Sequence, residues 1–169
     1  LKVEWIRGNI DTRIRKLEEG EFDAIILAAA GLKRMNWESR ISELLPVDTC
    51  IPAVGQGALA IECREDDEDL RKLLSLYNHE QTEIAVEAER VFLHRLNGGC
   101  QIPIGAYAEL IDDEAPTPMI QLTGMVGSAD GSKLLEAQRQ GRDPKQLGLE
   151  VAEQLIAQGA DEILAQVRG

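Results

Sequence analysis

The sequence predicts an α/β region followed by a small α+β domain with a three-stranded antiparallel sheet and helices. In the first part of the chain, strand-like apolar segments alternate with helical patterns, which is typical of α/β proteins with parallel strand pairing. In the second part, a long helical pattern precedes three strand-like segments and two more helical patterns, an order that is typical of α+β domains. The length of 169 residues suits one ordinary domain or two small ones.

The first region is expected to contain two strands and three helices. They are a strand over residues 3–6, a helix that Asn9 or Asp11 caps and Gly20 ends, a strand over residues 23–30, a short helix from Gly31, and another over residues 38–44. Asn and Asp are favoured at helix starts because their side-chain oxygens accept hydrogen bonds from free backbone N–H groups. The near-continuous apolar run over residues 23–30 is typical of a strand that is buried on both faces.

Prolines and an acidic run mark the middle of the chain. Pro46 and Pro52 bracket a segment that crosses between regions, and residues 58–63 are predicted to form a strand. The acidic residues 65–69 open a predicted helix whose apolar positions are Leu70, Leu73, Leu74 and Tyr77. Because carboxylates are favourable at a helix N-terminus, this charge run is interpreted as solvated surface that needs no partner.

The last region is expected to hold one long helix, three strands and two further helices. The predicted elements are a helix over residues 80–96, strands over residues 104–110, 119–127 and 133–138, a helix from Pro144 to Gly159, and a helix over residues 160–167. Asp130-Gly131 is a hairpin signal between the second and third strands. Asp143-Pro144 is a helix start, with a capping residue followed by proline at the first helical position.

Composition excludes several classes of function. The net charge of −12 argues against nucleic acid as the main partner, because phosphate binding needs a basic surface. No run approaches the roughly 20 apolar residues of a membrane span. Three cysteines without Cys-x-x-Cys spacing make disulfides and zinc poor expectations and fit a reducing cytoplasm. His79 and His94, which lack a partnering motif, are interpreted as a cap residue and a helix-surface residue.

Cys100 is the candidate for covalent chemistry. It follows Gly98 and Gly99, which end the long helix and display the cysteine on a bend with few side chains. One interpretation is a helix end followed by a half-buried structural cysteine, and the other is a covalent anchor, because a thiol is a good nucleophile at neutral pH. Cys50 and Cys63 look structural from their places beside a proline and at the end of an apolar segment.

Three arginines form a candidate anion site. Arg7 precedes one predicted helix, Arg13 lies near its start, and Arg34 falls in the first turn of the helix expected from Gly31. Cations are disfavoured at that end of a helix, so their presence suggests a bound anion, while ordinary exposed arginine is the alternative. Gln56 and Gly57, on the crossing segment, form a glycine-flanked polar turn that is a weak signal by itself.

Four stretches together are similar to one known family. They are residues 7–13 (RGNIDTR), residues 23–34 (DAIILAAAGLKR), residues 45–58 with Leu-Pro followed by IPAVGQGA, and residues 97–108 (NGGCQIPIGAYA). In order and spacing they resemble the porphobilinogen deaminases, also called hydroxymethylbilane synthases. The resemblance implies that residues 1–51 are the latter part of a second, periplasmic-binding-protein-like α/β domain. It further implies that residues 52–77 cross back to an absent first domain, and that residues 78–169 form the cofactor-bearing C-terminal domain.

The resemblance also implies an activity. The whole enzyme joins four porphobilinogen units with loss of ammonia in haem biosynthesis, building a linear polypyrrole on a dipyrromethane held through a thioether. The dipyrromethane attachment falls on Cys100. The binding arginines match Arg7, Arg13 and Arg34, and Gln56 and Gly57 border the cofactor. No position matches the family's catalytic aspartate, which is expected upstream, so the chain alone is expected to be inactive.

A second hypothesis remains open, namely a non-enzymatic α/β module that binds small carboxylate ligands. An intact mass that exceeds the polypeptide by two pyrrole units would discriminate between the two hypotheses. If the chain belongs to this family, we expect the full-length protein to be a cytoplasmic, monomeric transferase. Its expected partners are porphobilinogen and the growing polypyrrole, and we expect it to bind neither nucleic acid nor membrane.

Overall fold

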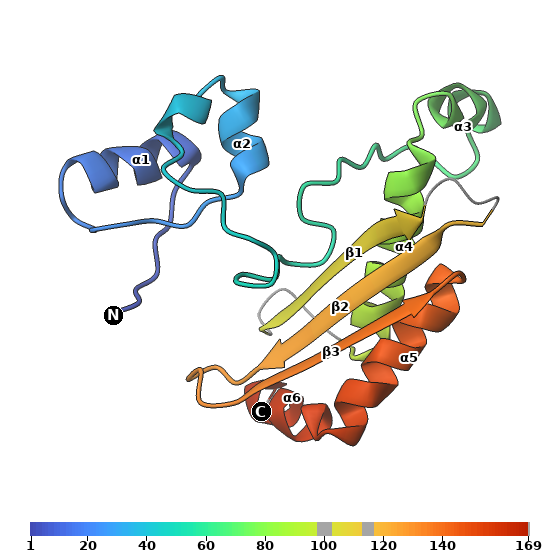
Figure 1. Ribbon diagram of the computed structural model, residues 1–169. Helices are drawn as coiled ribbons and strands as arrows, with labels where there is room; N and C mark the ends of the chain where they lie inside the picture. Colours follow the sequence, from blue (N-terminus) through green and yellow to red (C-terminus); the bar gives the residue numbers. More distant parts are fainter. Residues whose placement is uncertain (98–102, 113–116, 169) are drawn as a thin grey trace. The chain divides into compact units, whose positions relative to one another are not determined.

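The computed structural model describes residues 1–97, 103–112 and 117–168. The chain divides into two compact units, Leu1–Leu45 and Pro46–Gly169, and each is described by itself below. Figure 1 shows that helices make up the regular structure of the first unit, whereas the second unit combines a sheet with helices.

The first unit is built around two short helices, α1 (Ile10–Glu18) and α2 (Ala29–Arg34), followed by the 3-10 turn η1 (Glu38–Arg40). Of the two residues expected to cap this helix, Asn9 is the cap, because its side chain accepts a hydrogen bond from the Thr12 backbone N–H at 3.1 Å. The two helices approach closely where a Cβ on Gly31 would lie 2.6 Å from Cδ1 of Ile10. This contact holds the start of α1 against α2.

The strands predicted over residues 3–6, 23–30 and 58–63 are wrong, because the structure has no strand at those described positions. A segment becomes a strand only when a neighbouring strand pairs with its N–H and C=O groups, and no described segment does so here. The apolar side chains that would face a core are therefore exposed, as Trp5 at 94% and Leu59 at 78% illustrate.

Two helix boundaries also differ from those expected. The helix predicted from Gly31 begins two residues earlier, at Ala29. The helix predicted over residues 38–44 is wrong beyond η1, which ends at Arg40. A short helix is stable only when it buries an apolar face, and Leu44 and Leu45 of this segment are exposed.

The second unit contains the predicted three-stranded antiparallel sheet. Strands β1 (Ile104–Asp112), β2 (Met119–Gly127) and β3 (Leu134–Gly141) lie in sequence order, with β2 in the centre. Ala108 pairs with Leu122, and Leu122 pairs with Arg139. The expected bounds of β2 are confirmed, whereas β1 and β3 extend two and three residues beyond their predicted ends.

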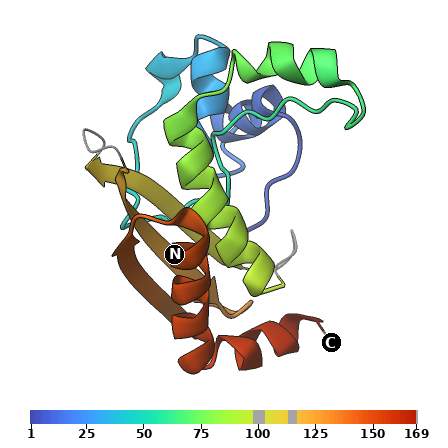
Figure 2. The same cartoon turned by 90° about the vertical axis from the view of Figure 1, so that its right-hand side faces the viewer.

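Helices α4 (Glu80–Arg95) and α5 (Pro144–Ala157) cover one face of this sheet, as Figure 2 shows. Helix α6 (Ala160–Arg168) follows α5, and α3 (Glu68–Ser75) precedes α4. The predicted helix starts are confirmed: the side chains of Asp67, His79 and Asp143 accept hydrogen bonds from backbone N–H groups at the starts of α3, α4 and α5.

The core of the second unit lies between the sheet and these helices. Its largest fully buried side chains are Phe92, Leu96, Ile120, Leu122, Leu147, Leu155, Leu164, Val126 and Val151. The opposite face of the sheet is polar, and its side chains are hydrogen-bonded across the strands. Gln121 donates to Glu109 at 3.2 Å and accepts from Gln140 at 2.9 Å, so this face suits contact with water.

Close approach of α4 and α5 depends on one glycine. A Cβ on Gly148 would lie 2.6 Å from the carbonyl oxygen of Ala88 and 2.9 Å from Cβ of Val91. Backbone atoms cannot move aside as a flexible side chain can, so any added methyl group must push the helices apart.

We predict that Gly148→Ala lowers the free energy of unfolding by about 1–3 kcal/mol through overpacking, although alanine favours helices intrinsically. Chemical denaturation of the two proteins measures the difference. Leu149→Ala, on the exposed side of the same helix, is the control and should change stability by less than about 1 kcal/mol. Equal stability of Gly148→Ala and the parent would contradict the close packing.

Candidate functional site

The turn that carries Arg7 leads directly into α1. Gly8 adopts φ +118, a conformation that glycine accommodates, and Asn9 then caps the helix. Arg13, one turn into α1, folds back so that its Nε donates to the carbonyl oxygen of Gly8 at 2.8 Å. The Arg13 side chain is thus fixed to the turn that directly follows Arg7.

Arg34 lies at the opposite end of its helix from the end predicted. Arg34 is the last residue of α2 and not in its first turn, because the helix begins at Ala29. Cations are favourable at a helix C-terminus, so the helix dipole gives no indication of a bound anion there. No ion pair found among the described residues involves Arg34, so its guanidinium group stays available to an anionic ligand.

The predicted arginines belong to a group of cations that form no ion pair with a carboxylate of the described residues. Within the described part of the first unit, Lys2, Arg15, Lys16 and Arg40 form ion pairs. None of the ion pairs found among described residues involves Arg7, Arg13, Lys33 or Arg34. In a protein with 30 acidic and 18 basic residues, guanidinium groups that pair with no described carboxylate are available for carboxylate ligands.

Gln56 and Gly57 lie in the second unit, on a compact turn between Ala53 and Ala58. The backbone N–H of Gln56 donates to the carbonyl of Ala53 at 2.9 Å, and that of Ala58 donates to the carbonyl of Gly55 at 3.2 Å. Gly55 and Gly57 have φ values of +70 and +90, which favour glycine. Gln56 and Gly57 are exposed, so a ligand can reach the Gln56 side chain and the Gly57 backbone.

The segment before this turn lies along the free edge of β1. The Ala106 N–H donates to the Pro52 carbonyl at 3.0 Å. A Cβ on Gly105 would lie 3.0 Å from the same carbonyl oxygen and 3.1 Å from Cγ2 of Ile51. Glycine at this position therefore permits Ile51 and Pro52 to approach the strand.

Sequence reasoning missed Glu89, the one buried charged residue among those described. Its Oε2 accepts from the Gly55 N–H at 2.7 Å and its Oε1 accepts from the Ala108 N–H at 2.9 Å. Burial raises the pKa of the Glu89 carboxyl above its ordinary value, while the two backbone hydrogen bonds act in the opposite direction. Helical spacing could have revealed it, since Glu89 lies between Ala88 and Phe92 on the buried face.

Cys100 lies outside the described residues, so its role stays a prediction. Cys50 is exposed and Cys63 is half-buried, and both are free thiols. The interpretation of the histidines is confirmed: His79 accepts from the Thr82 N–H at the start of α4, and His94 is exposed. Among the described residues, no cluster of His, Cys, Asp and Glu could hold a metal ion, and no helix is long and apolar enough to cross a membrane.

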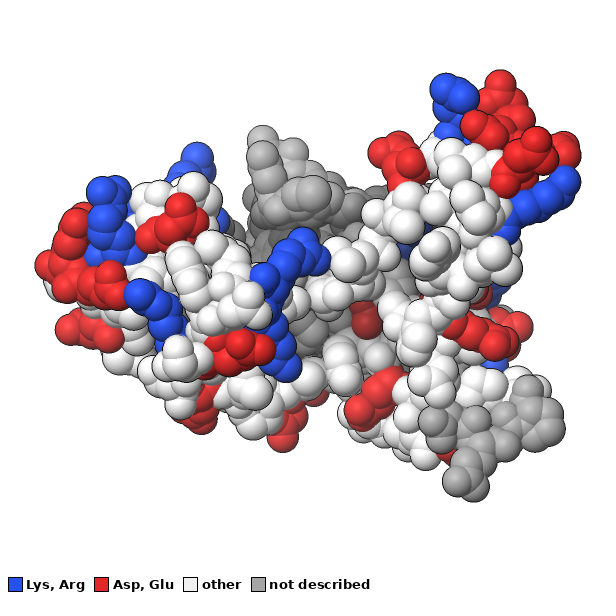
Figure 3. Space-filling view, turned by 90° about the horizontal axis from the view of Figure 1, so that it is seen from above, with Lys and Arg blue, Asp and Glu red and all other residues white. Residues whose placement is uncertain are grey.

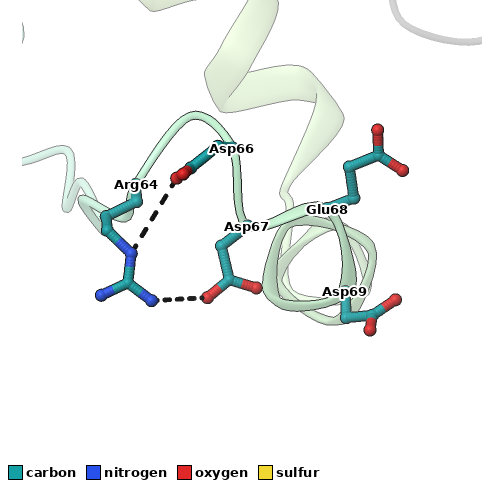
Figure 4. Close-up of a pocket in the computed structure, with 5 residues that line it drawn as sticks. All are labelled: Arg64, Asp66, Asp67, Glu68 and Asp69. Atoms are coloured by element: carbon teal, nitrogen blue, oxygen red, sulfur yellow. Dashed lines mark hydrogen bonds and ion pairs between the residues drawn. The ribbon is translucent and has the colours of Figure 1, made fainter.

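The acidic run forms a small open pocket at the start of α3 (Figure 4). Nη2 of Arg64 lies 3.2 Å from Oδ2 of Asp67, whose other oxygen accepts from the Leu70 N–H at 3.1 Å. Acidic and basic side chains gather together around this helix in Figure 3. The run is therefore partly neutralised by its own neighbours, as expected for solvated surface.

Two family models match the chain. Residues 1–72 match the model described as porphobilinogen deaminase, dipyromethane cofactor binding domain, and residues 83–157 match porphobilinogen deaminase, C-terminal domain. A porphobilinogen deaminase of Brevibacillus brevis is 58% identical over 167 residues, which are 99% of this chain and 53% of that relative. The chain belongs to the porphobilinogen deaminase family.

Other porphobilinogen deaminases match to the same degree. Those of Bacillus thuringiensis and Bacillus cereus are each 59% identical over 165 residues, which are 97% of the chain and 52% of those relatives. The chain spans about half the length of the curated relatives it matches. The cofactor-binding family model covers Arg7, Arg13, Arg34, Gln56 and Gly57, and the C-terminal model covers Cys100.

The raised pKa of Glu89 predicts how stability depends on pH. The folded protein holds the Glu89 carboxyl proton more tightly than the unfolded chain does. Protonation of Glu89 therefore stabilises the fold fully below the ordinary pKa near 4.5, and this stabilisation is lost as pH rises through the folded-state pKa. The difference in unfolding free energy between the parent and Glu89→Gln should therefore shrink as pH rises from 4, because glutamine does not titrate. Denaturant titrations from pH 4 to 8 measure it. A difference that grows with pH would show that folding lowers this pKa.

Proposed function

We propose that the chain, within a polypeptide of its relatives' full length, acts as a hydroxymethylbilane synthase. This enzyme polymerises four porphobilinogen units with loss of ammonia on a dipyrromethane that is attached through a thioether to Cys100. The observation that carries the proposal is identity of 58–59% with porphobilinogen deaminases over nearly the whole chain. The two family models, in consecutive order along the chain, support it.

The proposal includes a domain assignment. Residues 1–51 would be the latter part of a periplasmic-binding-protein-like domain, residues 52–77 the crossing segment, and residues 78–169 the cofactor-bearing domain. The hydrogen bond from the Ala106 N–H to the Pro52 carbonyl supports this assignment, because it would fix the start of the crossing segment to the cofactor-bearing domain.

The described residues fit a ligand that carries several carboxylates. Porphobilinogen has an acetate and a propionate group, and each added unit contributes two more carboxylates. Planar guanidinium groups bind carboxylates through paired hydrogen bonds, and Arg7, Arg13 and Arg34 have no described acidic side chain that competes for them. When bound, the dipyrromethane supplies a nucleophilic pyrrole carbon to which the first unit adds.

The residues of this chain then have distinct parts in the proposal. Arg7, Arg13 and Arg34 bind and orient carboxylates, and Gln56 with Gly57 offers polar contacts beside the cofactor. Departure of ammonia leaves positive charge that a nearby carboxylate would stabilise. Glu89 does not fit this role, because both of its oxygens already accept backbone hydrogen bonds. We therefore propose that the 169 residues alone are inactive and that the catalytic acid lies elsewhere in the longer polypeptide.

Cys100→Ser should abolish the mass of two pyrrole units that the full-length protein carries, because serine is too weak a nucleophile to replace the thiol. Cys50→Ser and Cys63→Ser are the controls and should keep that mass. Intact mass spectrometry of each purified protein decides. Retention of the added mass by Cys100→Ser would refute the attachment site, and a parent protein without it would favour the non-enzymatic binding module.

Arg7→Lys, Arg13→Lys and Arg34→Lys should each reduce turnover or cofactor loading by about tenfold, because an ammonium group cannot form the paired contacts of a guanidinium. Arg15→Lys is the matched control: Arg15 lies on α1, is exposed, and pairs with Glu19 at 3.9 Å. Porphobilinogen consumption and intact mass are measured for all four variants. Parent-like values for the three test variants would show that these residues are ordinary surface arginines with no role in binding carboxylates.

A further inference from the structure

We propose that Glu89 is a positioning residue for the cofactor site, because its carboxylate fixes the turn of Gln56 and Gly57 to strand β1. The inference rests on the proposed function, since it is the cofactor role of that turn which makes its position matter. The geometry itself is independent of the function. One side chain of α4 joins two segments that are distant in the sequence, through Gly55 and Ala108.

The Glu89 carboxylate is built into the structure as an acceptor. Its residue is 6% exposed, and each oxygen accepts one backbone N–H, at 2.7 Å from Gly55 and 2.9 Å from Ala108. No ion pair among the described residues involves Glu89, so these N–H groups are the partners that compensate its burial in the described part of the chain. Hydrogen bonds to an ionised acceptor are stronger than those between neutral groups.

The turn has few other attachments. Ideal Cβ positions on Gly55 and Gly57 meet no atom within 4 Å, so no other side chain packs against the turn on that side. Val54 is the turn residue that packs partly against the core. Loss of the Gly55 hydrogen bond would therefore release Gln56 and Gly57 while leaving the remainder of the unit packed.

Strand β1 supplies the fixed end of this connection. Ala106 and Ala108 both direct their N–H groups to the free edge of β1, the first to the Pro52 carbonyl and the second to Glu89. The same strand begins at Ile104, four residues after Cys100. Glu89 thus connects the turn proposed to border the cofactor with the strand that follows the proposed attachment residue.

A glutamine at this position would not replace the carboxylate. Its side chain has one acceptor oxygen, and its NH₂ group would face a second backbone N–H donor. At least one of the two N–H groups must then lose its partner. Aspartate keeps two acceptor oxygens on a side chain shorter by one methylene, so it should restore part of the connection.

Amide hydrogen exchange tests the connection in the 169-residue chain. In Glu89→Gln, the ratio of the Gly55 exchange rate to that of Ala106 should rise by about tenfold or more, and Glu89→Asp should fall between Glu89→Gln and the parent. Glu87→Gln, on the same helix with its carboxylate 3.3 Å from Lys145, is the control and should leave this ratio unchanged. Because the ratio compares two amides of one molecule, general destabilisation does not mimic the result. An unchanged ratio in Glu89→Gln would overturn the proposal.

The consequence for the cofactor site is tested in the full-length protein. Glu89→Gln should lower kcat per cofactor-loaded molecule by about tenfold and leave KM for porphobilinogen within about twofold, and Glu89→Asp should recover part of the loss. Leu164→Ala, which is destabilised at a fully buried core position of α6, should keep the parent kcat per loaded molecule. Parent-like kcat in Glu89→Gln would overturn the positioning role. A parent protein without the added pyrrole mass would instead refute the proposed function. The exchange ratio does not depend on the cofactor, so the two failures can be distinguished.

Discussion

Packing of α4 against the sheet is the interaction on which the second unit depends. Ala88 and Phe92 of α4 are completely buried, and ring atoms of Phe92 would lie 2.6 Å from a Cβ on Gly124 of β2. The helix therefore sits directly on the central strand. Since Glu89 projects from the same buried face, the packing that forms the core also determines where its carboxylate lies.

The two units differ in what stabilises them. The second unit buries a continuous apolar cluster contributed by α4, α5, α6 and all three strands. In the first unit the buried apolar side chains are Ile14 and Leu32, one from each short helix. Burial of apolar surface is the dominant favourable term in folding, so the free energy that holds Arg7, Arg13 and Arg34 in place is far smaller than that which holds the sheet.

The sequence predicted best those elements whose determinants are local. Asp143 and Pro144 specify the start of α5, and the alternating burial of β2 follows its alternating sequence. Residues 23–30 were mispredicted because strand formation depends on pairing with another segment, which an apolar run alone cannot reveal. Arg34 was placed in the wrong turn because a boundary shift of two residues exchanges the two ends of a helix of six residues. The contacts of Glu89 join residues 34 and 19 positions away, beyond the reach of periodicity.

The covered edge of β1 has a consequence for self-association. A strand at the margin of a sheet offers unpaired backbone groups on which another chain can build, and such templating begins many aggregates. The Pro52 carbonyl and the Glu89 carboxylate occupy two successive donors of β1, which leaves β3 as the other margin. There, Glu136 lies on the polar face while Arg139 bonds to Gln154 of α5 at 2.9 Å, so an incoming strand would meet charge on both faces of its neighbour. The sheet is thus protected at the β1 edge by occupied hydrogen-bond donors and at the β3 edge by charged side chains.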